Sequence, residues 1–410
     1  MDDSDVIESQ AVRPDLADLG RVPLILILRW VALALLALAL VAGAHLYIAT
    51  RLVGGLGLVG HLASVAWGAV WALFLSLFAA LFARRLPRRA SRALHFFSYS
   101  WMGLFALLVF TIAAVDLVSV VFALARGAPL SSRWGLLEVA AVAIIVVPAG
   151  AWGAVRALGK ARIEKIDVPI ACLPAELEGY RIVQLSDLHL GDTVGRDWAQ
   201  RLVDQVNALA PDAVAITGDI ADGGAARVRD ELAPLGSLRA KDGVFFVTGN
   251  HEYYNGLGGW LAEVRRLGFQ VLLNEHRVVH RGQAQLVVAG VTDYNGGEFL
   301  PGHASRPDLA LRDAPRGAPR ILLAHQPRTA FQAHGLDIDL QLSGHTHGGQ
   351  FFPWKYFVRL QQPVLSGMAR IGAVRVYTHR GTGFWGPPLR LMAPPEIAEL
   401  RLVRAAGSAS

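Results

Sequence analysis

The sequence of 410 residues contains a single cysteine, Cys172. One thiol cannot form a disulfide within the chain, and it cannot build a zinc or iron–sulfur site from several thiolates. These absences exclude a small secreted scaffold that is held together by disulfides. We expect Cys172 to be a small buried residue.

Charged side chains are also scarce, since Asp, Glu, Lys and Arg make up 18% of the chain, against about a quarter of a typical soluble domain. The mean hydropathy of +0.39 excludes a disordered chain. Four long stretches carry almost no charge: 30–50, 52–83, 93–125 and 134–155. About 20 helical residues cross a hydrocarbon core about 30 Å thick, so the sequence predicts an all-α bundle of about four transmembrane helices.

A cleaved signal peptide does not explain the first stretch, because the segment before Trp30 is rich in acidic residues and three more apolar stretches follow. The flanking segments on one side of the predicted spans hold twelve Lys and Arg residues, and those on the other side hold three. The twelve are Arg13, Arg21, Arg29, Arg84, Arg85, Arg88, Arg89, Arg92, Arg156, Lys160, Arg162 and Lys165; the three are Arg51, Arg126 and Arg133. Because short positive segments stay in the cytoplasm, we expect both termini on the cytoplasmic side of a bacterial-type inner or plasma membrane.

The third stretch contains one acidic residue, Asp116. A carboxylate inside a membrane is costly and often marks a proton or ion site. We expect Asp116 instead to reach the interface, as a lone acid near the end of a span can.

From Tyr180 onward, short apolar runs of strand length alternate with helical or loop segments, which is the pattern of an α/β domain. We therefore divide the chain into a cytoplasmic segment (1–29), a transmembrane region (30–155), a linker (156–179), an α/β domain (180–400) and a flexible tail (401–410). Five of the apolar runs lead directly into polar residues: Asp187 and His189; Asp219 and Asp222; Asn250 and His251; His325; His345 and His347. Because ligands bind outside the carboxyl ends of strands in such sheets, these side chains are expected to meet in one crevice.

The residue types at these five points fit a metal centre. Asp187 and His189 are two residues apart, so in an extended segment they point to the same side. Carboxylates, one amide and several imidazoles together suit Mn²⁺, Fe or Zn²⁺ better than Ca²⁺, which prefers oxygen ligands alone. Glycine precedes Asp219, Asn250 and His345, which allows tight turns and a close approach of the backbone to a phosphate.

The ordered motifs DLH, GDIAD, GNHE, AHQP and GHTHGGQ resemble those of the calcineurin-like metallophosphoesterase superfamily. With RIVQLSDLHLG and RGTGFWGPPLRLMAPPEI, the resemblance extends to its bacterial membrane-associated, YkuE/YaeI-like phosphodiesterase branch. It implies a four-layer α-β-β-α sandwich after the transmembrane helices.

The resemblance also implies two divalent metal ions, Mn²⁺ first and Fe or Zn²⁺ as alternatives. One ion would be held by Asp187, His189, Asp219 and His347, and the other by Asp219, Asn250, His325 and His345. The resemblance gives His251 the role of protonating the leaving oxygen, with Asp222 placed to orient His251 or a water. Glu252 stands where many relatives have Asp. Arg328 and Arg380 are candidate phosphate-binding residues.

The function that follows is that of a membrane-anchored phosphodiesterase or pyrophosphatase that uses metal-activated hydroxide. Its expected partners are membrane lipids and a lipid-linked phosphate, and relatives in this group include UDP-2,3-diacylglucosamine hydrolases. The alternatives are a nuclease or cyclic-nucleotide phosphodiesterase, and a non-catalytic membrane sensor or scaffold. We expect no nucleic-acid partner, because much of the excess Arg flanks the predicted spans. The aromatic segment 351–357 either forms an acyl-chain groove, dips toward the membrane interface or packs over the second sheet, and the oligomeric state stays open.

Overall fold

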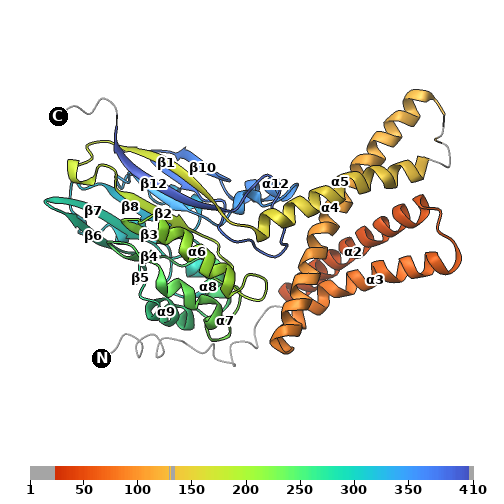
Figure 1. Ribbon diagram of the computed structural model, residues 1–410, viewed down its shortest axis with the longest axis horizontal. Helices are drawn as coiled ribbons and strands as arrows, with labels where there is room; N and C mark the ends of the chain where they lie inside the picture. Colours follow the sequence, from red (N-terminus) through yellow and green to blue (C-terminus); the bar gives the residue numbers. More distant parts are fainter. Residues whose placement is uncertain (1–23, 129, 131–133, 406–410) are drawn as a thin grey trace. The chain divides into compact units, whose positions relative to one another are not determined.

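The structure is a computed structural model that describes residues 24–128, 130 and 134–405 (Figure 1). The chain divides into two compact units, Met1–Ala151 and Trp152–Ser410. Most of the expected cytoplasmic segment 1–29 lies outside the described residues, as do residues 406–410 of the expected tail.

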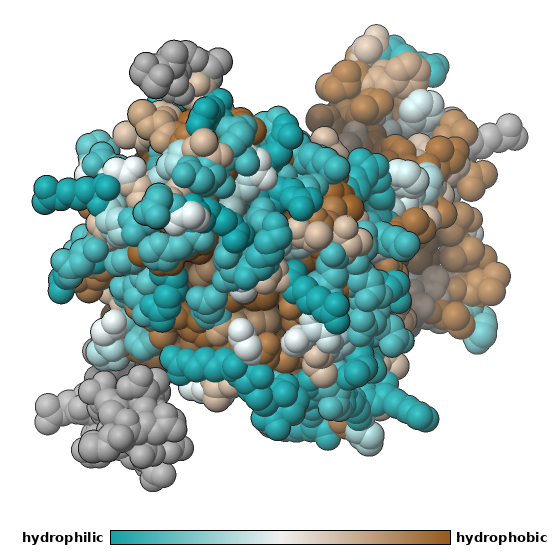
Figure 2. Space-filling view, turned by 60° about the vertical axis from the view of Figure 1, so that its left-hand side comes forward, coloured by the Kyte–Doolittle hydropathy of each residue, from teal (hydrophilic) through white to brown (hydrophobic). Residues whose placement is uncertain are grey.

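The first unit is helical. It contains α2 (Leu24–Gly55), α3 (Gly60–Phe82), α4 (Arg88–Arg126) and the first part of α5 (Trp134–Leu158). By length and composition, four helices of the described chain are able to cross a membrane, which confirms the predicted number of spans. The exposed surface of these helices is mostly hydrophobic, whereas that of the second unit is mostly hydrophilic (Figure 2).

The acidic residue of the third span is not a lone acid, which corrects the expectation for Asp116. Its carboxylate accepts a hydrogen bond of 2.6 Å from the Tyr47 hydroxyl and forms an ion pair with Arg51, both on α2. Arg51 also pairs with Glu138 of α5 at 2.8 Å. One cation thus joins the carboxylates of two other helices.

The second unit contains two six-stranded sheets. The first has the order β1 (Arg162–Ile170), β12 (Glu396–Arg404), β2 (Arg181–Leu185), β3 (Ala213–Ile216), β4 (Val244–Phe246), β5 (Gln270–Val271). The second has the order β10 (Gly367–Ile371), β11 (Val374–Thr378), β9 (Leu340–Ser343), β8 (Arg320–Leu323), β7 (Ala284–Gly290), β6 (Glu275–Arg281). Strands β2 to β5 are mutually parallel, as are β7, β8, β9 and β11.

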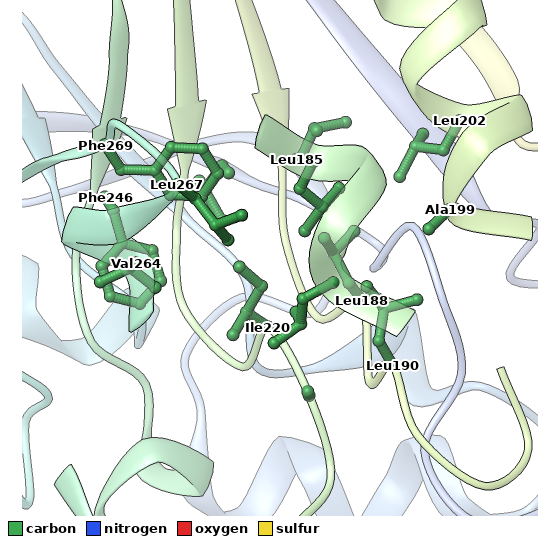
Figure 3. Packing of buried hydrophobic residues seen from close by; sticks show 14 of the residues in the cluster. Leu185, Leu188, Leu190, Ala199, Leu202, Ile220, Phe246, Val264, Leu267 and Phe269 are labelled. Carbon is green, nitrogen blue, oxygen red and sulfur yellow. The ribbon is translucent and has the colours of Figure 1, made fainter. Parts of the chain in front are cut away.

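The two sheets pack face to face. Because successive side chains of a strand point to opposite sides, one strand contributes to two cores. In β2, Ile182 lies in the core between the sheets, whereas Leu185 lies in the core under the helices. That outer core, seen in Figure 3, is covered by α6 (Arg196–Ala208), α7 (Ala225–Leu232) and α9 (Leu257–Arg266). Short helices, α11 (Pro307–Ala310) and η5 (Pro327–Phe331), cover the outer face of the second sheet. The expected α-β-β-α layers are confirmed.

The segment 156–179, expected as a linker, is folded into the second unit. It contains the end of α5, strand β1 and the short helix η3 (Ala175–Leu177). Strand β1 pairs in parallel with β12 along nine residues. Cys172 follows β1 and is exposed, so the expectation that it is buried is wrong.

Candidate metal centre

The five predicted strand ends are present and bring their polar residues together. Strands β2, β3 and β4 of the first sheet lead into Asp187, Asp219 and Asn250, and strands β8 and β9 of the second sheet lead into His325 and His345. Asn250 is the first residue of the short helix α8 (Asn250–Tyr254), and His347 begins the turn η6 (His347–Gly349). Both sheets therefore contribute to one cluster of polar side chains beyond the carboxyl ends of their strands, as the topology rule predicts.

The first group of metal-ligand atoms comes from Asp187, His189 and His347, and these atoms all lie within 4.8 Å of one another. The Nε2 atoms of His189 and His347 are 3.1 Å apart, and Nε2 of His347 is 3.4 Å from Oδ1 of Asp187. Nδ1 of His189 is 2.9 Å from the Asp222 carboxylate. That hydrogen bond fixes the proton on Nδ1, so the lone pair of Nε2 faces the other ligands.

The second group comes from Asp219, His325 and His345, again within 4.8 Å. Nε2 of His325 lies 3.2 Å from Oδ2 of Asp219, from Oδ1 of Asn250 and from Nδ1 of His345. Nδ1 of His325 donates to the carbonyl of Thr217 at 2.7 Å, so a neutral His325 would offer Nε2 to a metal. Oδ2 of Asp219 is also 3.9 Å from Nε2 of His189, so Asp219 lies between the two groups.

These donors fit two transition-metal cations. Imidazole nitrogens face other nitrogens at 3.1–3.2 Å, so each group brings two nitrogen donors close together. Burial, followed by the nearby His325, lowers the pKa of His345 to about 3. His345 is therefore neutral at physiological pH, which is the form of imidazole that binds metals.

The backbone of the ligand loops is unusual. Five predicted ligands have φ between 48° and 69°, in the left-handed region: Asp187, His189, Asp219, His345 and His347. Residues other than glycine rarely adopt this conformation, which costs on the order of 1–3 kcal/mol each and clusters at functional sites. The fold thus strains its backbone where these side chains must converge.

Two of the predicted glycines are required by crowding. A Cβ atom at Gly249 would overlap the Asp219 carboxylate, and one at Gly344 would overlap the side chains of Ser186 and Asp187. Any larger residue at these positions would displace a ligand carboxylate.

His251 lies beside the ligands with its ring partly accessible. Its Nδ1 is 2.7 Å from Oδ1 of Asp222, and its Nε2 is 4.0 Å from Oδ2 of Asp219. Burial lowers the pKa of His251, but the charge of Asp219 and the hydrogen bond to Asp222 raise it to about 9. Cations bound at Asp219 would oppose part of this rise. Asp222 therefore contacts both a predicted ligand, His189, and the predicted proton donor.

Glu252 is fully buried and organises two ligand loops. Its carboxylate accepts backbone hydrogen bonds from Gly249, Asp219 and Ile220 at 2.7, 3.0 and 2.9 Å. Burial and then the charge of Asp219 raise its pKa to about 7. Glu252, which is longer than the Asp of many relatives, thus holds the backbone of the loops that carry Asp219 and Asn250.

The two candidate phosphate-binding arginines have different neighbours. Arg328 donates to the neutral amides of Gln326 and Asn295, and its guanidinium lies 4.0 Å from the ring centre of Tyr294. Arg380 instead pairs with the carboxylates of Glu164 and Glu396 at 3.2 and 3.1 Å. Arg328 is therefore better placed than Arg380 to meet an anionic group.

Two residues near the centre were missed by the sequence reasoning. Arg390 is buried and donates to the carbonyls of His347, Arg380 and Gly383, and it lies 3.1 Å from Nδ1 of His347. Trp385 places its ring centre 6.2 Å from that of His251. Both belong to the RGTGFWGPPLRL segment. The sequence signal that could have identified Arg390 is its position between two leucines, where a charged side chain needs buried partners.

The family model for calcineurin-like phosphoesterases matches residues 180–349, the range that holds every predicted ligand. The transmembrane protein with metallophosphoesterase domain of Danio rerio is 35% identical over 324 residues, which cover 76% of this chain and 74% of that protein. The chain belongs to the calcineurin-like metallophosphoesterase family.

Two further comparisons cover a smaller share of this metallophosphoesterase. The uncharacterized metallophosphoesterase YkuE of Bacillus subtilis is 30% identical over 268 residues, which cover 62% of this chain and 90% of YkuE. Among solved structures, the 5′-nucleotidase precursor of Thermus thermophilus is 17% identical and covers 56% of this chain and 55% of its own, with a TM-score of 0.36.

Proposed function

We propose that this metallophosphoesterase hydrolyses a phosphodiester or pyrophosphate bond of a lipid-linked substrate at the cytoplasmic face of a membrane. The observation that carries the proposal is the position of Asp219 between the two groups of ligand atoms, with His251 beside them. The similarity to YkuE supports a place in the YkuE/YaeI-like branch.

The residues of the site have separate roles in this proposal. Asp187, His189, Asp219 and His347 would hold one cation, and Asp219, Asn250, His325 and His345 the other. Two such cations, with Mn²⁺ the first choice, would supply a water activated near neutral pH and would neutralise charge on the phosphate. Protonated His251 donates its Nε2 proton to the leaving oxygen, while Asp222 holds the ring by Nδ1.

The lipid part of the proposal is supported by the four spans, which keep the enzyme at a membrane. The uneven distribution of Lys and Arg supports a cytoplasmic catalytic unit. UDP-2,3-diacylglucosamine is the specific lipid to test, and nucleic acid is not the expected substrate.

The first experiment measures Mn²⁺-dependent hydrolysis of bis-p-nitrophenyl phosphate by the whole chain in detergent. Asp219→Asn and His251→Ala should each abolish most of the activity. Their matched controls, Asp308→Asn on the surface and His276→Ala on β6, should retain it. A wild-type protein that is inactive with every divalent metal would instead favour the sensor or scaffold.

The second experiment offers lipid pyrophosphates, including UDP-2,3-diacylglucosamine, in mixed micelles. Hydrolysis that again depends on Asp219 and His251 would support the lipid part. If the generic diester is cleaved while every lipid pyrophosphate stays intact, the enzyme is a phosphodiesterase with another substrate class.

A further inference from the structure

Helix α12 (Trp354–Gln361) is an amphipathic helix on the surface of the second unit. All eight of its residues are half-buried or exposed, so it does not pack over the sheet as one sequence interpretation allowed. We define the aromatic surface as Phe352, Trp354, Tyr356, Phe357 and Leu360, all of them exposed, Leu360 by 84%. At 100° per residue, the apolar side chains of α12 form one broad face, while Lys355 and Arg359 lie on the other. This combination is typical of helices that lie in a membrane interface.

The aromatic surface is continuous with the point at which a membrane helix enters the second unit. The backbone N–H of Arg390 donates to the carbonyl of Gly153, in the last turns of α5, at 3.0 Å. The next residue, Leu391, donates to the carbonyl of Gln350 at 3.1 Å, just before α12. Gly153, Leu391 and α12 all belong to the second unit, and in Figure 1 the yellow end of α5 and α12 lie at the same end of it.

The exposed side chains along this path are themselves apolar. Trp152 and Val155 of α5 are exposed, and so is Met392, by 80%. A cytoplasmic protein surface rarely gathers large apolar side chains in this way without a partner. Because α5 is long and apolar enough to cross a membrane, a bilayer is the partner that fits the apolar side chains beside it.

We propose that α12 lies in the headgroup region of the membrane that α5 crosses, with the aromatic surface toward the acyl chains and Lys355 and Arg359 toward anionic lipid phosphates. Aromatic rings and basic residues have these preferences at membrane interfaces. The inference rests on the proposed function, because it assumes a lipid-linked substrate. It deepens that function by linking α12 to the site: the turn η6, which contains the predicted ligand His347, directly precedes the segment with the aromatic surface.

The geometry adds a reason why this surface matters for the reaction. Gln350 donates to the carbonyl of Trp385 at 3.0 Å, and the Trp385 ring faces His251. This hydrogen bond links the residues that precede α12 to Trp385, whose ring lies beside His251.

The test uses the whole chain in vesicles with an environment-sensitive fluorophore on a cysteine. Leu360→Cys is labelled in a Cys172→Ser background, in phosphatidylcholine vesicles with and without phosphatidylglycerol. The native Cys172 is the matched control, because it is exposed and the nine-residue strand β1 places it about 30 Å further along the unit from α5. Leu38→Cys in α2 reports full membrane burial.

We expect the label at position 360 to shift to the blue and to lose roughly half or more of its fluorescence to lipids with shallow spin labels, whereas the label on Cys172 does neither. Lys355→Gln with Arg359→Gln should remove the added effect of phosphatidylglycerol. A label at 360 that behaves like Cys172 overturns the inference. A blue shift without lipid quenching also overturns it, and indicates a protein contact or a second copy. The readout does not involve hydrolysis, so its failure is distinct from failure of the proposed function.

Discussion

Carboxylates have different partners in the two units of this protein. In the helical unit, Asp116 is matched by Arg51 and by the Tyr47 hydroxyl. In the catalytic unit, Asp187 and Asp219 face histidines. An arginine keeps its proton and cannot bind a cation, whereas a neutral imidazole offers a lone pair. The partner of the acid, more than its burial, distinguishes a cluster that joins helices from one whose donors fit a metal ion.

The largest effect should come from the carboxylate between the ligand groups. Asp219→Asn removes the charged donor that the two proposed cations would share. We therefore expect the rate of hydrolysis to fall by more than the roughly 100-fold that loss of a supporting residue costs. Metal content measured by mass spectrometry should fall with it. Asp116→Asn is the matched control, and a loss of metal in that variant would break the comparison between the units.

His251→Ala should separate proton donation from metal binding. We expect kcat for bis-p-nitrophenyl phosphate to fall by about 10²–10⁴-fold while the metal content stays at the wild-type level. Asp222→Asn should cost less, about 10–100-fold, because it supports both His189 and His251 without donating the proton. If the His251 variant lost as much metal as Asp219→Asn, His251 would be a metal ligand and not a proton donor.

Arg390→Met should show how far the ligand loop depends on its support. The substitution leaves the carbonyls of His347, Arg380 and Gly383 without their buried donor, which should cost about 1–3 kcal/mol of unfolding free energy. We expect metal affinity, measured by titration calorimetry, to fall by about 10–100-fold. Arg312→Met, at an arginine outside the centre, is the control. An unchanged metal affinity would show that Arg390 stabilises the fold without supporting the ligands.

Arg51→Gln should have the smallest effect and should be confined to stability. It leaves Asp116 and Glu138 without their shared cation, and polar contacts between membrane helices are worth about 1 kcal/mol. Thermal unfolding in detergent should therefore shift slightly downward, with metal content and hydrolysis unchanged. A strong loss of activity would show that the helical unit acts on the reaction.

The sequence was sufficient to predict which segments come together beyond the ends of the strands. Asp187, Asp219 and His345 follow apolar runs of strand length, and the carboxyl ends of neighbouring strands must meet at one edge. The partners of Asp116 and the contacts of Arg390 depend instead on segments far apart in the chain. No spacing rule predicts these contacts. Cys172 was misjudged for a similar reason, since a turn after β1 exposes it although composition favours burial of cysteine.

The contact of α5 with the catalytic unit has a consequence for cutting the chain. Ala157 of α5 lies in the same buried cluster as Leu185 and Ile216, and β1 is the edge strand that covers β12. A shortened protein that starts at Tyr180 would therefore lose part of its core and leave the edge of β12 open to other chains, which invites aggregation. One that starts before Trp152 keeps both, because the last membrane helix supplies a piece of the enzyme itself.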